Sequence, residues 1–255
     1  MSEGYYGQYG TLGLATPQAN PTAETEFRAL LPARVACATV RMVSADPEPA
    51  NRLRAYFQNI DETLQRFDTL PLNAVALACT GSTYLLGHEH VEQSLTELSQ
   101  ARGYPIVSAA AAIERALKFI GASSIALTCP YPDWLLNAAQ AHWQGRGFSI
   151  ADQFSLDPNQ GDTRAIYALS PQRAAEGITA RWQRVSADAY LVTGTGLPTL
   201  RLIAELSAVL PGPVFSSNLC LAWAALQDGG IDFADHQPGG NLPLLAGWQG
   251  GIDRL

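Results

Sequence analysis

Ala74-Val75-Ala76-Leu77-Ala78-Cys79-Thr80-Gly81-Ser82-Thr83 joins a short apolar run to a turn of small polar residues. A continuous apolar run of this length is typical of a strand that is buried on both faces of a parallel sheet. The end of the stretch recurs later in the chain, where Val192-Thr193-Gly194-Thr195-Gly196 matches Leu77-Ala78-Cys79-Thr80-Gly81. The stretch therefore predicts a strand–turn–helix unit that the fold uses twice.

Two more strand ends recur at a similar distance along the chain. Ala15-Thr16-Pro17-Gln18 is echoed by Thr128-Cys129-Pro130-Tyr131, and Pro105-Ile106-Val107-Ser108 is echoed by Pro213-Val214-Phe215-Ser216. The offsets all lie between 108 and 115 residues, which favours two homologous halves over chance similarity between turns. Ligands of open parallel sheets bind beyond the carboxyl ends of the strands. We therefore expect the active site in the cleft between the halves.

Short apolar runs alternate with longer amphipathic segments along the chain, as in βαβ units with a parallel sheet. The expected strands are Thr11–Thr16, Arg34–Met42, Ala74–Ala78, Ile106–Ser108, Ser124–Thr128, Ala189–Thr193 and Val214–Ser216. The expected helices are Pro21–Leu31, Pro47–Phe67, His90–Arg102, Ala109–Ile120, Leu135–Gly145, Pro171–Arg184 and Pro198–Leu210. The predicted fold class is α/β, with two pseudo-symmetric Rossmann-like halves, each a parallel sheet flanked by helices.

The repeat also predicts how the chain divides into halves. The first half is expected over residues 1–120, and the second half over residues 121–213. Residues 214–255 are expected to join the first half, with their C-terminal helix packed back on it.

Composition argues against several classes of protein. Only 15% of the 255 residues are charged, the net charge is −7, and no run is rich in Lys and Arg, so no nucleic-acid partner is expected. No apolar stretch reaches the roughly 20 residues of a membrane helix, and Met1–Tyr6 lacks the basic and apolar regions of a signal peptide. We expect a cytoplasmic protein without membrane association, whose four cysteines stay as free thiols.

Cys79 is the most informative single residue. In the turn after a strand it meets backbone N–H groups, which lower the pKa of a thiol and favour the thiolate. The same N–H groups and the hydroxyls of Thr80, Ser82 and Thr83 are suited to bind a carboxylate or enolate oxygen. A free cysteine is as often a small buried hydrophobe, so both interpretations of Cys79 stay open.

Other motifs give weaker signals. Gly194-Thr195-Gly196 allows close approach of the backbone to a ligand, but it does not extend to GxGxxG. The chain has no Walker-type loop and no GxSxG nucleophile elbow. His88-Glu89-His90 lacks the HExxH spacing of a zinc site, and its two histidines would point apart on a helix. No metal is therefore expected, and dinucleotide binding is only weakly supported.

Taken together, these residues resemble the aspartate/glutamate racemase superfamily, on the branch of maleate cis–trans isomerases and arylmalonate decarboxylases. The resemblance covers roughly Gly10 to Gly230. The motifs that carry it are Leu12-Gly13-Leu14, Pro17-Gln18-Ala19-Asn20, Ala78-Cys79-Thr80, Pro130-Tyr131, Gly196-Leu197-Pro198-Thr199-Leu200 and Ser216-Ser217-Asn218. The resemblance implies a cofactor-free site between two halves, a small carboxylic acid as substrate, and self-association as a homodimer.

The family's isomerases and racemases place one cysteine from each half beside the substrate. Cys79 is similar to the first of these, whereas Gly194 stands at the second position. A two-cysteine mechanism would therefore need Cys129 or Cys220 in that role. Arylmalonate decarboxylases have their single cysteine in the second half, so this chain is similar to their mirror image. The expected catalytic residue is Cys79, and the expected substrate-binding residues are Asn20, Thr80, Gly81, Tyr131, Gly194, Thr195, Gly196 and Asn218.

A single cysteine protonates an intermediate from one face only, which suits decarboxylation of a 2-substituted malonate. Backbone N–H groups of the two turns would hold the remaining carboxylate while Cys79 protonates the enediolate as general acid. The alternative is a maleate cis–trans isomerase, in which Cys79 adds to the alkene and is expelled after rotation. Arg41 and Arg164 are expected to form surface ion pairs rather than to bind a second carboxylate.

Two further alternatives stay open. Amino-acid racemisation requires an acid and a base on opposite faces of the substrate. A non-catalytic carboxylate-binding protein would be favoured by an inert Cys79 thiol with a high pKa.

Overall fold

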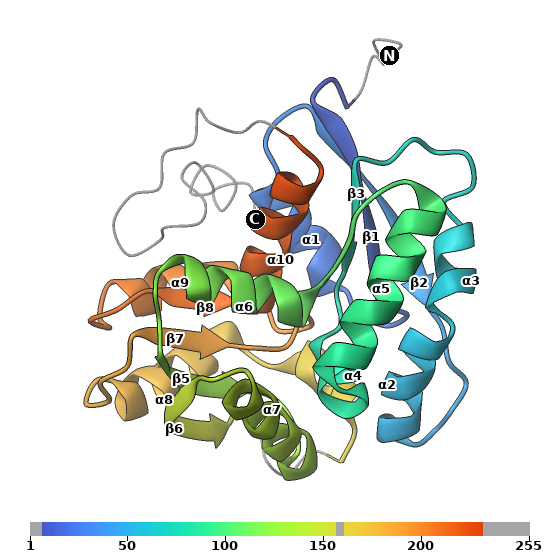
Figure 1. Ribbon diagram of the computed structural model, residues 1–255. Coiled ribbons are helices and arrows are strands. Elements are labelled where there is room, and N and C mark those ends of the chain that lie inside the picture. The colour runs from blue at the N-terminus through green and yellow to red at the C-terminus, as the bar shows by residue number, and fades with distance from the viewer. Residues whose placement is uncertain (1–6, 157–160, 232–255) are drawn as a thin grey trace.

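Two four-stranded parallel sheets organise the part of the chain that the computed structural model describes, residues 7–156 and 161–231 (Figure 1). The strand order is β2-β1-β3-β4 in one sheet and β6-β5-β7-β8 in the other, so each strand has a counterpart at the same place in the second sheet. The strands are β1 (Gly10–Pro17), β2 (Val35–Met42), β3 (Ala74–Leu77), β4 (Ile106–Ser108), β5 (Ser124–Cys129), β6 (Ser149–Ser155), β7 (Ala189–Val192) and β8 (Val214–Ser216). The predicted α/β class with two pseudo-symmetric halves is confirmed.

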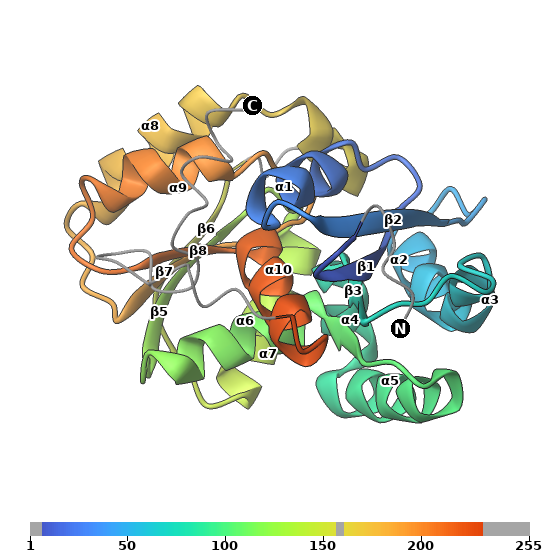
Figure 2. The same ribbon diagram turned by 90° about the horizontal axis from the view of Figure 1, so that it is seen from above.

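Helices flank both sheets, and two of them lie between the sheets. Figure 2 shows α6 and α10 between the two groups of strands, where they pack on each other, and α10 also contacts α1, β3 and β4. The helices are α1 (Thr22–Leu30), α2 (Pro49–Gln58), α3 (Ile60–Gln65), α4 (Thr80–Leu86), α5 (His88–Arg102), α6 (Ala109–Phe119), α7 (Asp133–Gly145), the 3-10 helix η1 (Thr163–Ala168), α8 (Pro171–Trp182), α9 (Leu200–Ser207) and α10 (Ser217–Asp228).

The repeat extends to the first residues of the two central helices. Ser108 ends β4, and its Oγ accepts a hydrogen bond from the Ala111 N–H at 3.1 Å. Ser216 ends β8, and its Oγ accepts from the Leu219 N–H at 3.3 Å. A serine at this position stabilises a helix by about 1 kcal/mol relative to alanine. A serine therefore starts the helix that follows the last strand of each sheet, α6 after β4 and α10 after β8.

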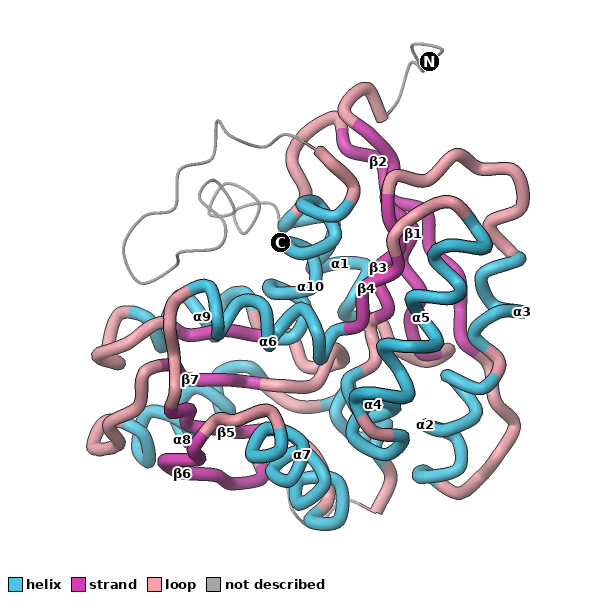
Figure 3. The backbone as a smooth tube through the Cα atoms, in the orientation of Figure 1, coloured by secondary structure: helices cyan, strands magenta, loops and turns pink. Residues whose placement is uncertain are grey.

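β1 and β5 each pair with a neighbouring strand on both sides, and this arrangement determines where a ligand site is expected. Leu14 of β1 lies between Thr39 and Ala76, and Leu127 of β5 lies between Gln153 and Leu191. The chain thus winds outward in opposite directions from β1 and from β5, as Figure 3 shows for the two groups of strands. Ligands of doubly wound sheets bind at this switch point, beyond the carboxyl ends of the strands.

Several elements differ from the sequence predictions. β6 (Ser149–Ser155) was not predicted, because it is a half-exposed edge strand with a mixed polar sequence rather than an apolar run. The expected helix Pro47–Phe67 is two helices, α2 and α3, which are separated at Asn59. The turn after Cys79 is the helix α4. Its first five residues are all buried, so it carries no amphipathic pattern.

The division into domains stays a prediction. β8 pairs with β7 in the second sheet, so that sheet extends three residues past the expected boundary at residue 213. The segments 1–6 and 232–255, which include the expected C-terminal end of the first half and Met1–Tyr6, lie outside the described residues. Among the described residues, no helix has both the length and the apolar character needed to span a membrane.

Candidate active site

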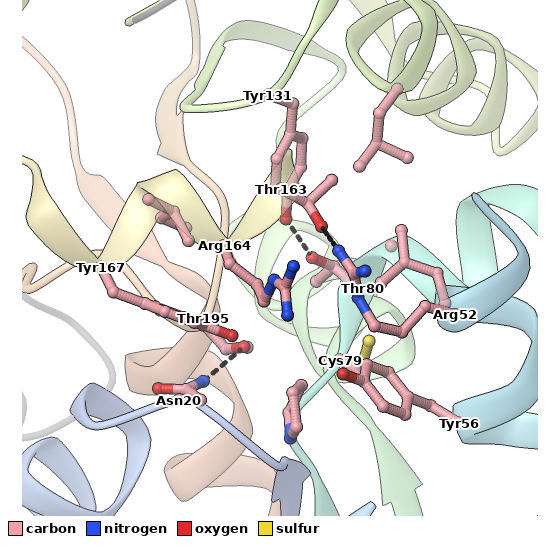
Figure 4. A pocket seen from close by; sticks show the side chains of 16 residues that line it. Asn20, Arg52, Tyr56, Cys79, Thr80, Tyr131, Thr163, Arg164, Tyr167 and Thr195 are labelled. Carbon is pink, nitrogen blue, oxygen red and sulfur yellow. Dashed lines mark hydrogen bonds between the residues drawn. The ribbon is translucent and has the colours of Figure 1, made fainter. Parts of the chain in front are cut away.

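The carboxyl ends of the central strands meet at one cavity of about 40 Å³ (Figure 4). The residues after β1 and β3 reach it from the first half, and those after β5 and β7 reach it from the second. On this measure one water molecule needs about 10–15 Å³, so the cavity suits a small ligand. The predicted site residues that line it are Asn20, Cys79, Thr80, Gly81, Tyr131, Thr195 and Gly196.

Cys79 lies between β3 and α4 and is 4% exposed. Its Sγ is 3.1 Å from the Ser82 Oγ, and the Ser82 hydroxyl donates to the Leu53 carbonyl at 2.6 Å. Because a hydroxyl has a single proton, Ser82 accepts from the Cys79 thiol in this arrangement. Burial raises the pKa of Cys79, and hydrogen bonds at the sulfur, including those from the Ser82 and Gly81 N–H groups, only partly oppose it.

The expectation of a lowered Cys79 pKa is therefore wrong. The backbone N–H groups are present as predicted, but the loss of hydration around a buried thiolate outweighs them. At neutral pH Cys79 is therefore a thiol.

Tyr131 and Thr80 join the two halves across the cavity. The Tyr131 hydroxyl and the Thr80 Oγ1 are 2.8 Å apart. Burial raises the pKa of Tyr131 well above its ordinary value, so the phenol keeps its proton. Two hydroxyls that share one hydrogen bond leave one O–H free to donate. That O–H can donate either to a ligand oxygen or to the Tyr84 hydroxyl, which also hydrogen-bonds with the Thr80 side chain.

Asn20 is held so that its amide nitrogen can serve as a donor. Its Oδ1 accepts from the backbone N–H groups of Thr22 and Ala23 at the start of α1, at 2.9 and 3.1 Å. Its Nδ2 therefore points the other way and donates to the Thr195 Oγ1 at 3.3 Å. The Thr195 hydroxyl in turn donates to the Ala78 carbonyl of the first half at 2.8 Å.

Gly194 has no place for a side chain. Its φ angle of +105° is rarely adopted by other residues, and a Cβ here would lie 2.9 Å from the Ile166 Cδ1 and 3.2 Å from the Pro130 Cδ. Gly194 is not among the lining residues, and its backbone N–H donates to the Ser217 Oγ at 3.1 Å, so its contact with substrate stays a prediction. Ile166 of η1 lines the cavity and fills the space where a second cysteine would stand.

Asn218 does not line the cavity either, and its predicted contact with substrate stays a prediction. It is 1% exposed, and its Nδ2 donates to the Glu26 Oε2 at 2.7 Å and to the Thr195 carbonyl at 3.0 Å. Glu26 also accepts from the backbone N–H groups of Thr199 and Leu200 at the start of α9. Asn218 therefore stabilises the turn that carries Thr195 without lining the cavity itself.

Cys129 and Cys220 do not replace the missing second cysteine. Both are 0% exposed, and neither lines the cavity. Burial raises the pKa of both thiols. All four cysteines are free, and Cys79 alone among them lines the cavity.

Sequence reasoning missed one side of the cavity. Arg52, Leu53 and Tyr56 of α2 line it, and so does Ile166 of η1. No local pattern marks these residues, since they reach the site only through the packing of α2 and η1 over the strand ends. Arg41 pairs with Glu24 outside the cavity, as expected, but Arg164 lines the cavity in addition to forming an ion pair.

His88 belongs to the His88-Glu89-His90 motif, for which no zinc site is predicted. The His88 Nε2 lies 3.9 Å from the Glu114 Oε2. Across the described residues, no group of three or more His, Cys, Asp and Glu side chains is arranged to hold a metal ion.

The fold and the cavity define a protein of two equivalent α/β halves with a cysteine-bearing site between them. The chain belongs to the arylmalonate decarboxylase family, whose model matches residues 50–241. The predicted branch of the aspartate/glutamate racemase superfamily is thereby confirmed. The prediction that the chain is an enzyme, a lyase or an isomerase, is confirmed with it.

Curated relatives extend over most of the chain. The maleate isomerase of Geobacillus stearothermophilus is 27% identical over 232 residues, which are 85% of this chain and 90% of the relative. The maleate isomerase of Nocardia farcinica is 27% identical over 229 residues, which are 85% of this chain and 88% of the relative.

Solved structures share the fold. The maleate isomerase Iso of Pseudomonas putida S16 has a TM-score of 0.78 at 22% identity and covers 94% of this chain and 99% of its own. A cysteine-to-serine mutant of the Nocardia farcinica maleate cis–trans isomerase, with a covalently bound succinylcysteine intermediate, has a TM-score of 0.73 at 22% identity and covers 87% and 93%. A liganded arylmalonate decarboxylase mutant, with a cysteine in place of a glycine and a serine in place of a cysteine, has a TM-score of 0.74 at 20% identity and covers 87% and 93%.

Proposed function

We propose that the chain catalyses cis–trans isomerisation of a maleate-like dicarboxylate through one covalent bond to Cys79. The observation that carries the proposal is that Cys79 alone among the four cysteines lines the cavity, while Ile166 fills the equivalent place in the second half. The names of the curated relatives support it. So does the succinylcysteine in a related isomerase that has lost one cysteine to serine, since one thiol sufficed there to form an adduct.

The chemistry needs one nucleophile and no second acid. The Cys79 sulfur bonds to one alkene carbon, the π electron pair moves into the adjacent carboxylate to give an enediolate, and the thiol proton passes to that carboxylate. The former double bond is now single and rotates. The enediolate pair then re-forms the double bond in the trans geometry, the carbon–sulfur bond breaks, and the proton returns to sulfur.

The raised pKa of Cys79 fits this sequence of steps. A neutral thiol carries the proton that the substrate carboxylate receives, so no thiolate has to form before the substrate binds. The high pKa that would favour a non-catalytic binder is therefore also compatible with catalysis by a thiol. Adduct formation separates the two, because a binder forms none.

Polar groups of both halves are positioned for the charge that develops. The free O–H of the Thr80–Tyr131 pair and the Asn20 amide face the cavity beside Cys79. Donors that are already in place when an enediolate forms stabilise it without reorganisation. Ile166, which fills the place of a second cysteine, offers no acid or base there, and this argues against two-cysteine racemisation.

Decarboxylation of a 2-substituted malonate is the reaction predicted from the sequence, and the comparisons favour its alternative. A departing carboxylate leaves more readily from an apolar pocket, whereas Arg52 and Arg164 both line this cavity. The small volume also fits an aliphatic diacid better than an arylmalonate. Phenylmalonate therefore serves as a competing substrate in the test.

Intact-protein mass spectrometry and product analysis test the proposal together. Wild-type protein incubated with maleate should gain the mass of one maleate and release fumarate. Cys79→Ala should do neither, and the matched variant Cys220→Ala, which alters a cysteine outside the cavity, should do both. Wild-type protein that forms no adduct and no fumarate contradicts the proposal, and carbon dioxide from phenylmalonate would establish the decarboxylase instead.

A cytoplasmic location and a homodimer belong to the same proposal. Light scattering of the purified chain tests the dimer, and fractionation of the source cells tests the location. A monomeric mass would remove the homodimer from the proposal and leave the chemistry at Cys79 unchanged.

A further inference from the structure

Asp162 connects two arginines at the cavity. Its Oδ1 accepts from the Arg52 Nη2 at 2.6 Å, and its Oδ2 accepts from the Arg164 Nε at 2.9 Å and Nη2 at 2.5 Å. Both arginines line the cavity, whereas Asp162 does not. Partial burial raises the pKa of Asp162, but the hydrogen bonds from Arg164 outweigh this effect. The pKa of Asp162 is therefore lowered, and the carboxylate stays charged. Two positive charges and one negative charge leave one net positive charge at the cavity.

Arg52 is fixed on both sides of its guanidinium. Its side chain is 1% exposed. Nη1 donates to the Asp46 and Pro47 carbonyls, each at 3.3 Å, while Nη2 donates to Asp162 and, at 3.5 Å, to the Thr163 Oγ1. A buried guanidinium with this many partners has little freedom to move. Arg52 therefore anchors Asp162, and through it Arg164, to the first half.

Arg164 differs from Arg52 in having donors to spare. Asp162 occupies its Nε and Nη2, so both hydrogens of Nη1 have no partner among the described residues. Figure 4 shows the guanidinium of Arg164 pointing into the cavity toward Thr80 and Cys79. A guanidinium held by a carboxylate on one edge presents its other edge to an anion.

We propose that Arg164 binds the second carboxylate of the substrate and that Arg52 is a positioning residue that holds it there through Asp162. The first carboxylate then lies at Asn20 and the Thr80–Tyr131 pair, so the site selects dianions over acids with a single charge. This selectivity rests on the proposed isomerase function, whose substrate has two carboxylates. The proposal adds the residues that bind each of the two carboxylates.

Calorimetric binding of succinate and succinamate tests the proposal without any turnover. The two ligands have the same length, but succinamate has a neutral amide in place of one carboxylate. Wild-type protein should bind succinate about ten- to hundredfold more tightly, as expected for one additional charge-assisted contact. Arg164→Ala should bring the ratio of the two affinities close to one, because a single anion subsite then remains.

Three further variants separate charge, positioning and fold. Arg164→Lys should keep part of the preference, since it keeps the charge without the planar fork. Asp162→Asn should lower the preference by releasing Arg164, while the melting temperature shows that the fold persists. Arg184→Ala removes an exposed arginine away from the cavity and should leave the preference unchanged.

The outcomes separate this proposal from the isomerase itself. An unchanged preference for succinate in Arg164→Ala would overturn the proposal, even if wild-type protein converts maleate to fumarate. A preference that depends on Arg164 in a protein that leaves maleate unchanged would support the second carboxylate subsite and reject the isomerase. Equal wild-type affinities for succinate and succinamate would also overturn the proposal.

Discussion

The turns after β3 and β7 stand at equivalent places in their sheets, yet only one of them carries a reactive atom. Cys79 in the first turn starts α4 and reaches the cavity. Gly194 in the second turn has a φ angle of +105°, and Ile166 packs where its side chain would be. The difference teaches that a repeated backbone can keep its ligand-binding groups in both copies while the chemistry is confined to one face of the substrate.

Removal of the Cys79 sulfur should have the largest effect, because it abolishes the difference between the two turns. Cys79→Ala should lower the rate of maleate isomerisation by roughly a thousandfold or more, since a residue that forms the covalent bond has no substitute. Steady-state fumarate production measures it, with Cys220→Ala as the matched control. Equal losses in the two variants would mean that Cys79 has no special role.

A second cysteine in the other turn should fail unless Ile166 makes room. Gly194→Cys should destabilise the protein by about 1–3 kcal/mol, because it combines an unfavourable backbone angle with a clash. Gly194→Cys combined with Ile166→Ala should be more stable than the sum of the single effects by about 0.5–3 kcal/mol.

Denaturant unfolding measures this coupling, and alkylation followed by peptide mapping shows which thiols react. Only the double variant should present a second reactive thiol at position 194. Full additivity of the two substitutions would show that Ile166 does not occupy the space of the missing side chain.

Two asparagines, Asn20 in the cavity and Asn218 outside it, should behave differently. Asn20→Ala should raise KM about tenfold, because a donor to the substrate carboxylate is lost. Asn218→Ala should mainly lower stability, by about 1–3 kcal/mol, because it leaves the buried Glu26 with one partner fewer. Steady-state kinetics and thermal unfolding of both variants test this distinction. A larger rise in KM for Asn218→Ala than for Asn20→Ala would contradict it.

The smallest effect concerns the titration of Cys79. Its pKa is raised, so the thiolate fraction at neutral pH is below that of a free cysteine, and the alkylation rate should still be rising above pH of about 8.5. Iodoacetamide labelling as a function of pH, with N-acetylcysteine as the reference, gives the midpoint. A midpoint below that of the reference would restore the thiolate that the turn sequence predicts.

Much of this arrangement follows from the sequence, and the limits have physical causes. The apolar runs and the small polar residues after them predict where the strands end, and strand ends bring Asn20, Cys79, Tyr131 and Thr195 together. Arg52 and Ile166 are different, because only the tertiary packing of α2 and η1 brings them to the cavity. The Cys79 pKa was mispredicted for a related reason, since local N–H groups are visible in the sequence but burial is not.

The most direct test of one-cysteine isomerisation is proton NMR of wild-type protein with maleate in D2O. Because addition and elimination at Cys79 transfer no proton to carbon, fumarate should form without deuterium on carbon, and Cys79→Ala should form none. Fumarate that carries deuterium on carbon would contradict one-cysteine isomerisation, since it would reveal a proton transfer to carbon that addition and elimination at Cys79 do not include. Unchanged maleate would contradict it as well.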